Sequence, residues 1–259
     1  MTALWNPIPV FMLTVRQFVG GKAVRVVTLI ALLPVLFAII FALSSSDTDG
    51  QNFIGVVIFE AMFIATLLPI CVLILATGAI GNEIEDQTLP YLTLKPISRL
   101  RIVFEKLFAT VVTAVPPIGS GLILAYLLVF RSTALDAENL PFLWPMLASA
   151  FAGIVAYSAV FLLVSLFINR ALLAGITYAL LWESLLGRYL PGLRVVSIRH
   201  YTESIYVGLL SEPRYRSVVA VGDGLDNPDT AMVSVIVLSV VSLAAALLSV
   251  WRLRNLNLE

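Results

Sequence analysis

Residues 81–106 read GNEIEDQTLPYLTLKPISRLRIVFEK, a dense polar segment in an otherwise very apolar chain. The segment holds four of the sixteen acidic residues and four of the sixteen basic residues of the protein. Apolar runs of about twenty residues, the length that a helix needs to cross a bilayer, lie on both sides of it. The pattern predicts two membrane spans joined by a specialised polar connection.

The composition of the whole chain supports an integral membrane protein. Of the 259 residues, 60% are hydrophobic and only 12% are charged, whereas about a quarter of the residues of a soluble domain are charged. The formal net charge is zero, so the chain lacks the basic excess that is typical of proteins that bind nucleic acid. A single cysteine, Cys71, excludes a disulfide within the chain, and no metal-ligand spacing is present.

Six apolar runs are candidates for spans. They cover residues 23–43, 53–80, 107–130, 142–168, 171–187 and 231–250. The fifth is the weakest, because it is short and contains Glu183. The runs are continuous rather than alternating, which favours helices over a β-barrel. The predicted fold is an all-α integral membrane protein with six transmembrane helices in a single domain, residues 1–259.

The distribution of Lys and Arg predicts the orientation. The short connection 44–52 contains none, whereas 81–106 contains four. Because cytoplasmic loops carry the excess of Lys and Arg, both termini are predicted to be cytoplasmic and 188–229 extracytoplasmic. Residues 8–22 are too short to span and mix apolar residues with Arg16. They predict an interfacial amphipathic helix, with an unstructured tail as the alternative.

Within 81–106, the sequence predicts where the third long helix begins. Pro96 disfavours helix in the residue before it. Ser98 is well placed to cap the next helix. That helix is expected to begin near Arg99 and to continue through Lys106 into the third span.

The first half of the segment combines acidic and apolar side chains. Glu83, Glu85 and Asp86 are expected to lie in water at the end of the second span. The apolar residues that follow are Leu89, Tyr91, Leu92 and Leu94. They form either a docking surface for another protein or a patch that folds back on the bundle's own cytoplasmic ends, and periodicity leaves both open.

Taken together, the segment resembles the connection between the second and third helices of ABC-2 type transporter permeases. The family pattern is an acidic cluster, Gly-Thr-Leu, an apolar pair, Pro-Ile-Ser-Arg and a Lys in the next helix. The matching residues are Glu83, Glu85, Thr88, Leu89, Leu92, Pro96, Ile97, Ser98, Arg99 and Lys106. Two residues depart from it: Gln87 replaces the family's glycine, and Pro90 is unusual after Thr-Leu.

The resemblance implies a function and partners. It implies a coupling helix that sits in a groove of an ATP-binding subunit, two permease copies with two such subunits, and a bacterial plasma membrane. The complex is expected to export its cargo, with ATP and Mg²⁺ on the partner and no cofactor on this chain. In agreement, the chain has no G-x-x-x-x-G-K-[ST] phosphate loop.

Other classes of function remain alternatives to this interpretation. A stand-alone channel or secondary transporter would work without ATP or a second subunit. An ABC complex that performs mechanical or maturation work is a third possibility. An intramembrane enzyme is disfavoured, because His200 is the only histidine and the H-E-x-x-H and G-x-S-x-G motifs are absent.

Four residues within the predicted spans are candidates for the translocation path. Glu60 and Glu183 are acids in apolar runs, which usually face an interior or a cavity. Both lie near the predicted outer ends of their helices, so an interfacial position is the alternative. Pro116 and Pro117 are expected to kink the third span, either as part of the path wall or simply for packing.

Overall fold

The structure is a computed structural model that describes residues 9–44, 49–85, 97–168, 170–179, 197–210 and 229–255. All regular secondary structure in these residues is helical. Within these described ranges, five segments are long and apolar enough to cross a membrane: Lys22–Leu43, Gly50–Gly81, Arg99–Thr133, Leu140–Phe167 and Ala231–Asn255. They match the first, second, third, fourth and sixth predicted spans. Of the predicted fifth span, only 171–179 belong to the described residues.

The N-terminal part of the chain forms three successive helices. They are α1 (Pro9–Gly20), α2 (Lys22–Ala31) and α3 (Leu33–Leu43). The first span consists of α2 and α3 and is interrupted at Leu32. Pro34 lies in the first turn of α3, where its missing amide costs nothing, whereas in a continuous helix it would break the hydrogen-bond ladder.

The remaining helices are longer. The second span is formed by α4 (Gly50–Asn52), the π-helical η1 (Phe53–Leu67) and α5 (Leu68–Glu85). It is followed by α7 (Arg99–Phe130) with the short turn η2 (Arg131–Thr133), then α8 (Leu140–Phe167), α9 (Ala171–Thr177), α11 (Ile198–Leu209) and α13 (Ala231–Asn255). The expected start of α7 at Arg99 is confirmed, with the Ser98 hydroxyl accepting a hydrogen bond from the Arg101 amide at 3.4 Å.

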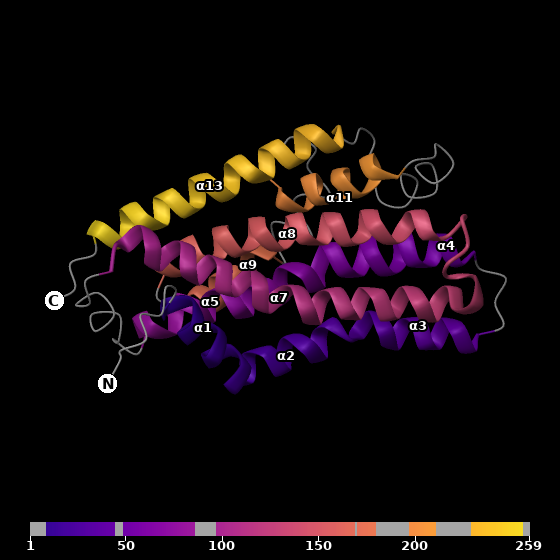
Figure 1. Ribbon diagram of the computed structural model, residues 1–259, viewed down its shortest axis with the longest axis horizontal. Coiled ribbons are helices and arrows are strands. Elements are labelled where there is room, and N and C mark those ends of the chain that lie inside the picture. The colour runs from indigo at the N-terminus through magenta and orange to yellow at the C-terminus, as the bar shows by residue number, and fades with distance from the viewer. Residues whose placement is uncertain are drawn as a thin grey trace, which may run out of the picture.

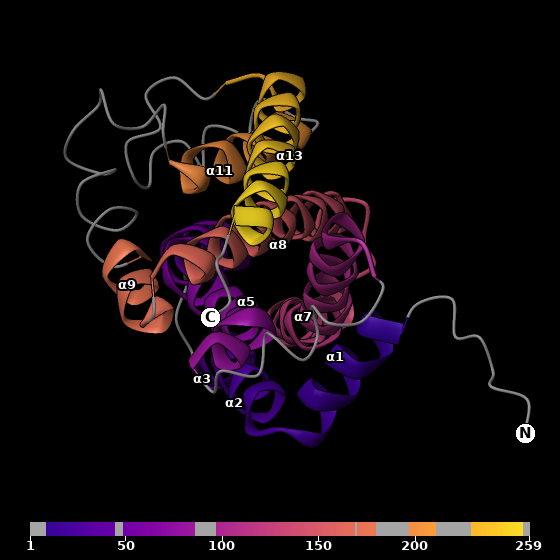
Figure 2. The ribbon, with the colours of Figure 1, turned by 90° about the vertical axis from the view of Figure 1, so that its left-hand side faces the viewer.

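The helices form one elongated bundle (Figure 1). Its centre is the packing of α5 against α8, with α7 beside both of them. Viewed along the bundle (Figure 2), α1, α2 and α3 lie on the α7 side, and α11 and α13 lie beyond α8. Both α8 and α13 finish at the same end, while α13 starts at the opposite end. Residues 168–230 connect the end of α8 to the start of α13, and the structure describes 168, 170–179, 197–210 and 229–230 of them.

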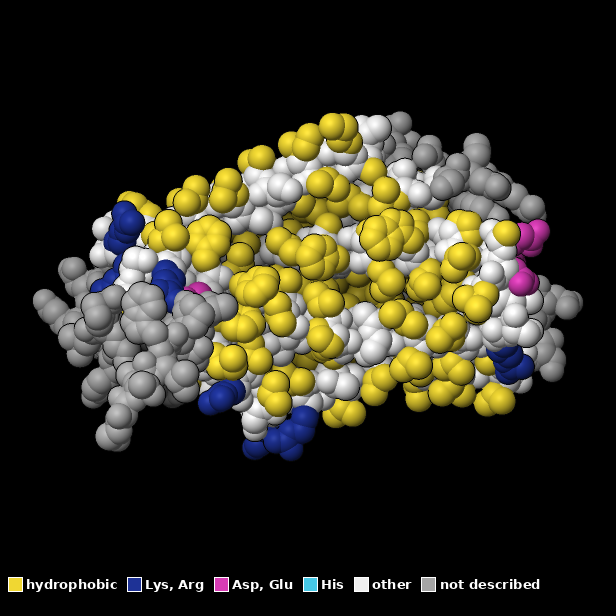
Figure 3. Space-filling view, in the orientation of Figure 1, with side chains coloured by type: hydrophobic (Ala, Val, Ile, Leu, Met, Phe, Trp, Pro, Cys, Tyr) yellow, Lys and Arg dark blue, Asp and Glu magenta, His cyan; other side chains and the backbone are white. Residues whose placement is uncertain are grey.

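Charged side chains gather at the two ends of the bundle, and apolar side chains cover the middle (Figure 3). The end at which α5 finishes and α7 begins is called the basic end here. Among the described residues, the exposed or half-buried Lys and Arg side chains at this end are Arg16, Lys22, Arg25, Arg99, Arg101, Arg170, Arg252 and Arg254. This division is the one expected of a protein whose middle lies in hydrocarbon.

The helix α11 is polar yet buried inside the bundle. It packs against η1, α8 and α13. A Cβ atom added to Gly153, near the middle of α8, would lie 3.2 Å from the Thr202 side chain. Within α11, Arg199 Nε contacts Glu203 Oε1 at 2.5 Å, so two buried charges compensate each other. The sequence placed this region in an extracytoplasmic segment, but α11 reaches the depth of the middle of α8.

Candidate functional site

The candidate site lies at the basic end, where α5 leaves the bundle and α7 enters it. These two helices flank the segment 86–96, which lies outside the described residues. The site is therefore built from the side chains that hold the two flanking helices together and from those that attach α1 to them.

Lys106 joins α7 to α5 from inside the bundle. Its side chain is 1% exposed. The ammonium group donates to Glu83 Oε1 at 2.7 Å and also to the carbonyl oxygen of Ala79. A buried cation is tolerated when its charge and its donors are both matched, and Glu83 and Ala79 provide this match. The last turns of α5 are thereby fixed to the first turns of α7.

Glu105, the neighbour of Lys106 in the chain, attaches α1 to α7. Its Oε2 atom accepts hydrogen bonds from the amides of Val10 (2.8 Å) and Phe11 (2.9 Å). These amides belong to the first turn of α1, where no carbonyl within the helix can reach them. A carboxylate is also favourable at the positive end of a helix dipole. Its Oε1 atom contacts Arg101 Nε at 2.5 Å.

Replacing Glu105 with alanine is expected to release α1 from the bundle. Two first-turn amides lose their acceptor, and Arg101 loses its contact with Glu105, so the free energy of unfolding should fall by about 1–3 kcal/mol. A cysteine placed at Thr14, which is 1% exposed, reports the release through its rate of thiol labelling. Glu105→Gln, which keeps an oxygen acceptor, serves as the milder control. Unchanged labelling at Thr14→Cys would show that other contacts hold α1.

The structure brings together some of the site residues proposed from the sequence. Glu83 and Lys106 form an ion pair, and Ser98 caps the helix that begins at Arg99. The backbone of Glu85 ends α5. The remaining proposed residues of the coupling segment, Thr88, Leu89, Leu92 and Pro96, lie outside the described residues.

Two features of this site differ from what the sequence suggested. Glu83 was expected to lie in water, but its side chain is 15% exposed and turns toward Lys106 inside the bundle. Glu105 was not proposed as a site residue. The only local signal for its importance was the four-residue spacing from Arg101, which is the spacing of a helical ion pair. Its contact with α1 joins residues 94 and 95 positions apart, which no local pattern can reveal.

The proposed path residues occupy separate places in the bundle. Glu60 lies in η1 with 1% exposure, so it is buried in the protein rather than placed at an exposed interface. The ring of the adjacent Phe59 contacts Tyr206 of α11, with centroids 4.6 Å apart. Pro116 lines an apolar cavity between α7 and α8. Glu183 lies outside the described residues.

Comparison with known proteins identifies the family. The family described as "ABC-2 family transporter protein" matches residues 21–183, more than half of the chain. The match extends from the start of α2 past the end of α9 and includes Glu83, Glu105 and Lys106. No curated protein matches the chain. With five apolar segments of spanning length in the part of the chain that the structure describes, this multi-pass membrane protein belongs to the ABC-2 family of transporter membrane proteins.

Proposed function

We propose that the chain is the permease subunit of an ABC-2 exporter, driven by a separate ATP-binding subunit that docks on residues 86–96 at the basic end. Members of the family are typically permeases without catalysis of their own. The chain lacks a phosphate-binding loop, so ATP and Mg²⁺ belong on the partner. The excess of Lys and Arg at the basic end supports a cytoplasmic position for the docking segment, where ATP is available to a subunit docked there.

The observation that carries the proposal is the buried contact between Lys106 and Glu83. Residues 86–96 leave α5 and return to α7 just beyond this contact. A force applied to the segment therefore acts on two helices that are joined by an ion pair, and Glu105 passes it on to α1. Such a joined group of helices can move as one unit between two arrangements, which is how a motor subunit drives a conformational change.

A second copy of the chain completes the proposed transporter. In the first and last spans, only 22% of the residues in the most apolar stretch are buried within the protein. The corresponding share in the second span is 67%. These outer spans have apolar surface for both lipid and a second copy. The cargo path would then lie between two such bundles.

The test is recovery of the ATP-binding subunit with the tagged permease in mild detergent. Leu92→Asp is expected to abolish recovery of the partner, because it puts a charge in the apolar part of the docking segment. Thr93→Asp is the matched control, because it adds the same charge one residue away at a position that is already polar. Both variants should remain monodisperse with an unchanged melting temperature.

Two results would contradict the proposal. Full recovery of the partner by Leu92→Asp would mean that the apolar residues of the segment do not form the docking surface. Recovery of the permease alone, together with solute or ion flux in vesicles without ATP, would favour a stand-alone channel or secondary transporter.

A further inference from the structure

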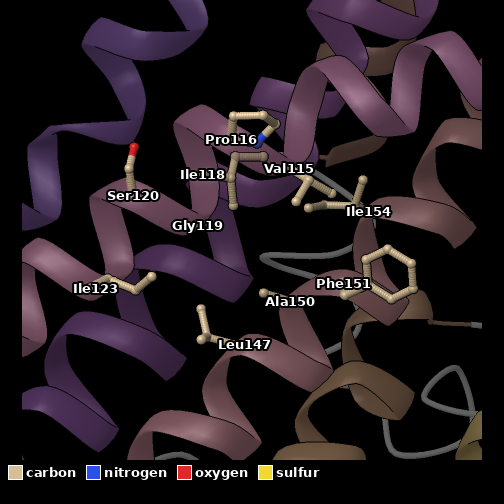
Figure 4. A pocket seen from close by; sticks show the side chains of 10 residues that line it. All are labelled: Val115, Pro116, Ile118, Gly119, Ser120, Ile123, Leu147, Ala150, Phe151 and Ile154. Carbon is tan, nitrogen blue, oxygen red and sulfur yellow. The ribbon is translucent and has the colours of Figure 1, made fainter.

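A cavity of about 390 Å³ lies between the middle of α7 and the middle of α8 (Figure 4). Its size falls within the range of about 300–1,000 Å³ found for small-ligand sites. The lining residues from α7 are Val115, Pro116, Ile118, Gly119, Ser120 and Ile123, and those from α8 are Leu147, Ala150, Phe151 and Ile154. The cavity is separate from the coupling site at the basic end.

The lining accepts only an apolar occupant. Ser120 is the one lining residue with a polar side chain, and its hydroxyl already donates to the Pro117 carbonyl oxygen at 3.1 Å. In Figure 4 this hydroxyl points away from the other side chains. A water molecule needs two to four polar partners to remain in a cavity, and this lining does not offer them. The cavity is therefore a site for hydrocarbon.

The position of the cavity determines which hydrocarbon reaches it. Both walls belong to segments long and apolar enough to cross the bilayer, and the lining residues lie near the middle of each. At that depth the surrounding medium is lipid acyl chain. Ile123 is 37% exposed and Phe151 is 52% exposed, so the cavity opens sideways to this medium rather than to water.

Two glycines in α7 differ in why they lack a side chain. One is required by the close packing of α2, and the other, which lines the cavity, is not. A Cβ atom added to Gly121 would overlap the carbonyl oxygen of Ala31, so the close approach of α2 requires a glycine there. A Cβ atom added to Gly119 would have nothing within 4 Å. No contact within the described chain requires Gly119 to lack a side chain, although glycine weakens a helix interior. The missing side chain leaves space for an external group.

We infer that this cavity binds one acyl chain of a bilayer phospholipid. A liquid water molecule takes about 30 Å³, and a methylene group is of similar size, so the space fits roughly a dozen methylene groups. A flexible chain can follow the lining between Pro116 and Phe151. Two turns of a helix from a second protein copy, about 10 Å across and about 11 Å long, occupy roughly 850 Å³, which is more than the cavity holds. The bound lipid would fill the gap beside the proline pair of α7.

The test is photocrosslinking of the full-length protein in phosphatidylcholine vesicles. A small fraction of the phospholipid carries a diazirine in the middle of one acyl chain, and crosslinked residues are identified by mass spectrometry. Crosslinks to Ile123, Leu147 and Phe151 are expected to exceed several-fold those to Leu243 and Leu247 of α13. The latter two are 55% and 50% exposed and provide an internal reference for general contact with lipid.

Cavity-filling variants decide whether the enrichment comes from the cavity. Gly119→Leu is expected to lower the crosslinks to the reference level, and Ala150→Leu should do the same from the opposite wall if the first variant fails to fold. Leu127→Phe adds volume to α7 outside the cavity, at a residue that is 42% exposed, and should leave the enrichment unchanged. Crosslinks at the reference level in the unmodified protein would overturn the inference. So would enrichment that survives filling, or capture of a second copy of the chain in place of lipid.

Discussion

Replacing Lys106 with methionine is expected to have the largest effect on stability of any single change at the basic end. The variant removes the Lys106 ammonium group from Glu83, which stays mostly buried, and from the Ala79 carbonyl oxygen. Removing one partner of a buried ion pair typically costs about 3–5 kcal/mol. Because Glu83 is 15% exposed and can regain some water, a value near the lower end is expected. Thermal and denaturant unfolding in detergent measure the loss.

A double variant distinguishes the cost of leaving one charge unpaired from the cost of removing both charges of the pair. Lys106→Met combined with Glu83→Gln removes both charges, so much of the lost stability should return. Arg101→Met serves as the matched control for loss of a cation in the same helix. Its side chain is 43% exposed, and an exposed pair contributes only about 0–1 kcal/mol. Equal losses in the free energy of unfolding for Lys106→Met and Arg101→Met would show that burial does not strengthen the contribution of the Lys106 contact to stability.

Gly121→Leu is expected to separate α2 from α7 and to prevent correct folding of the first span. The new side chain would occupy the space of the Ala31 carbonyl group, which belongs to the backbone and cannot rotate away. Overpacking against side chains costs about 1–3 kcal/mol, and a collision with backbone should exceed that range. Gel filtration and the melting temperature in detergent provide the measurement.

The matched control for this change lies two residues earlier in the same helix. Gly119→Leu makes the identical substitution at a position where an added Cβ atom meets nothing within 4 Å. It should keep or slightly raise the melting temperature, because leucine is a better helix former than glycine. Similar melting temperatures for the two variants would show that the contact between α2 and α7 is not tight.

The membrane spans could be predicted well from the sequence because lipid imposes a local requirement. Each stretch of backbone must satisfy its own hydrogen bonds, so an apolar run of sufficient length is enough to identify a span. The start of α7 was also predictable, because Ser98 caps it through contacts within four residues. The interruption at Leu32 has an equally local cause in Pro34.

The side-chain contacts that define the candidate site could not be predicted in the same way. The local sequence around Lys106, FEKLF at residues 104–108, agrees equally well with a cation that turns to water and with one that pairs inside the bundle. The choice depends on where Glu83, 23 residues earlier, is placed by the packing of α5 against α7. The burial of α11 has a similar origin, because its polar residues become acceptable only through pairs such as Arg199 with Glu203.

The contact between Glu105 and the first turn of α1 also sets an order of events during biosynthesis. The helix α1 leaves the ribosome before α7 does, and the carboxylate that fixes its position is made about 95 residues later. Synthesis proceeds at about 5–20 residues per second, so α1 waits several seconds for its acceptor. The helix α1 is therefore fixed only after the second span and the start of α7 have been made, and its attachment marks completion of the part of α7 that lies at the basic end.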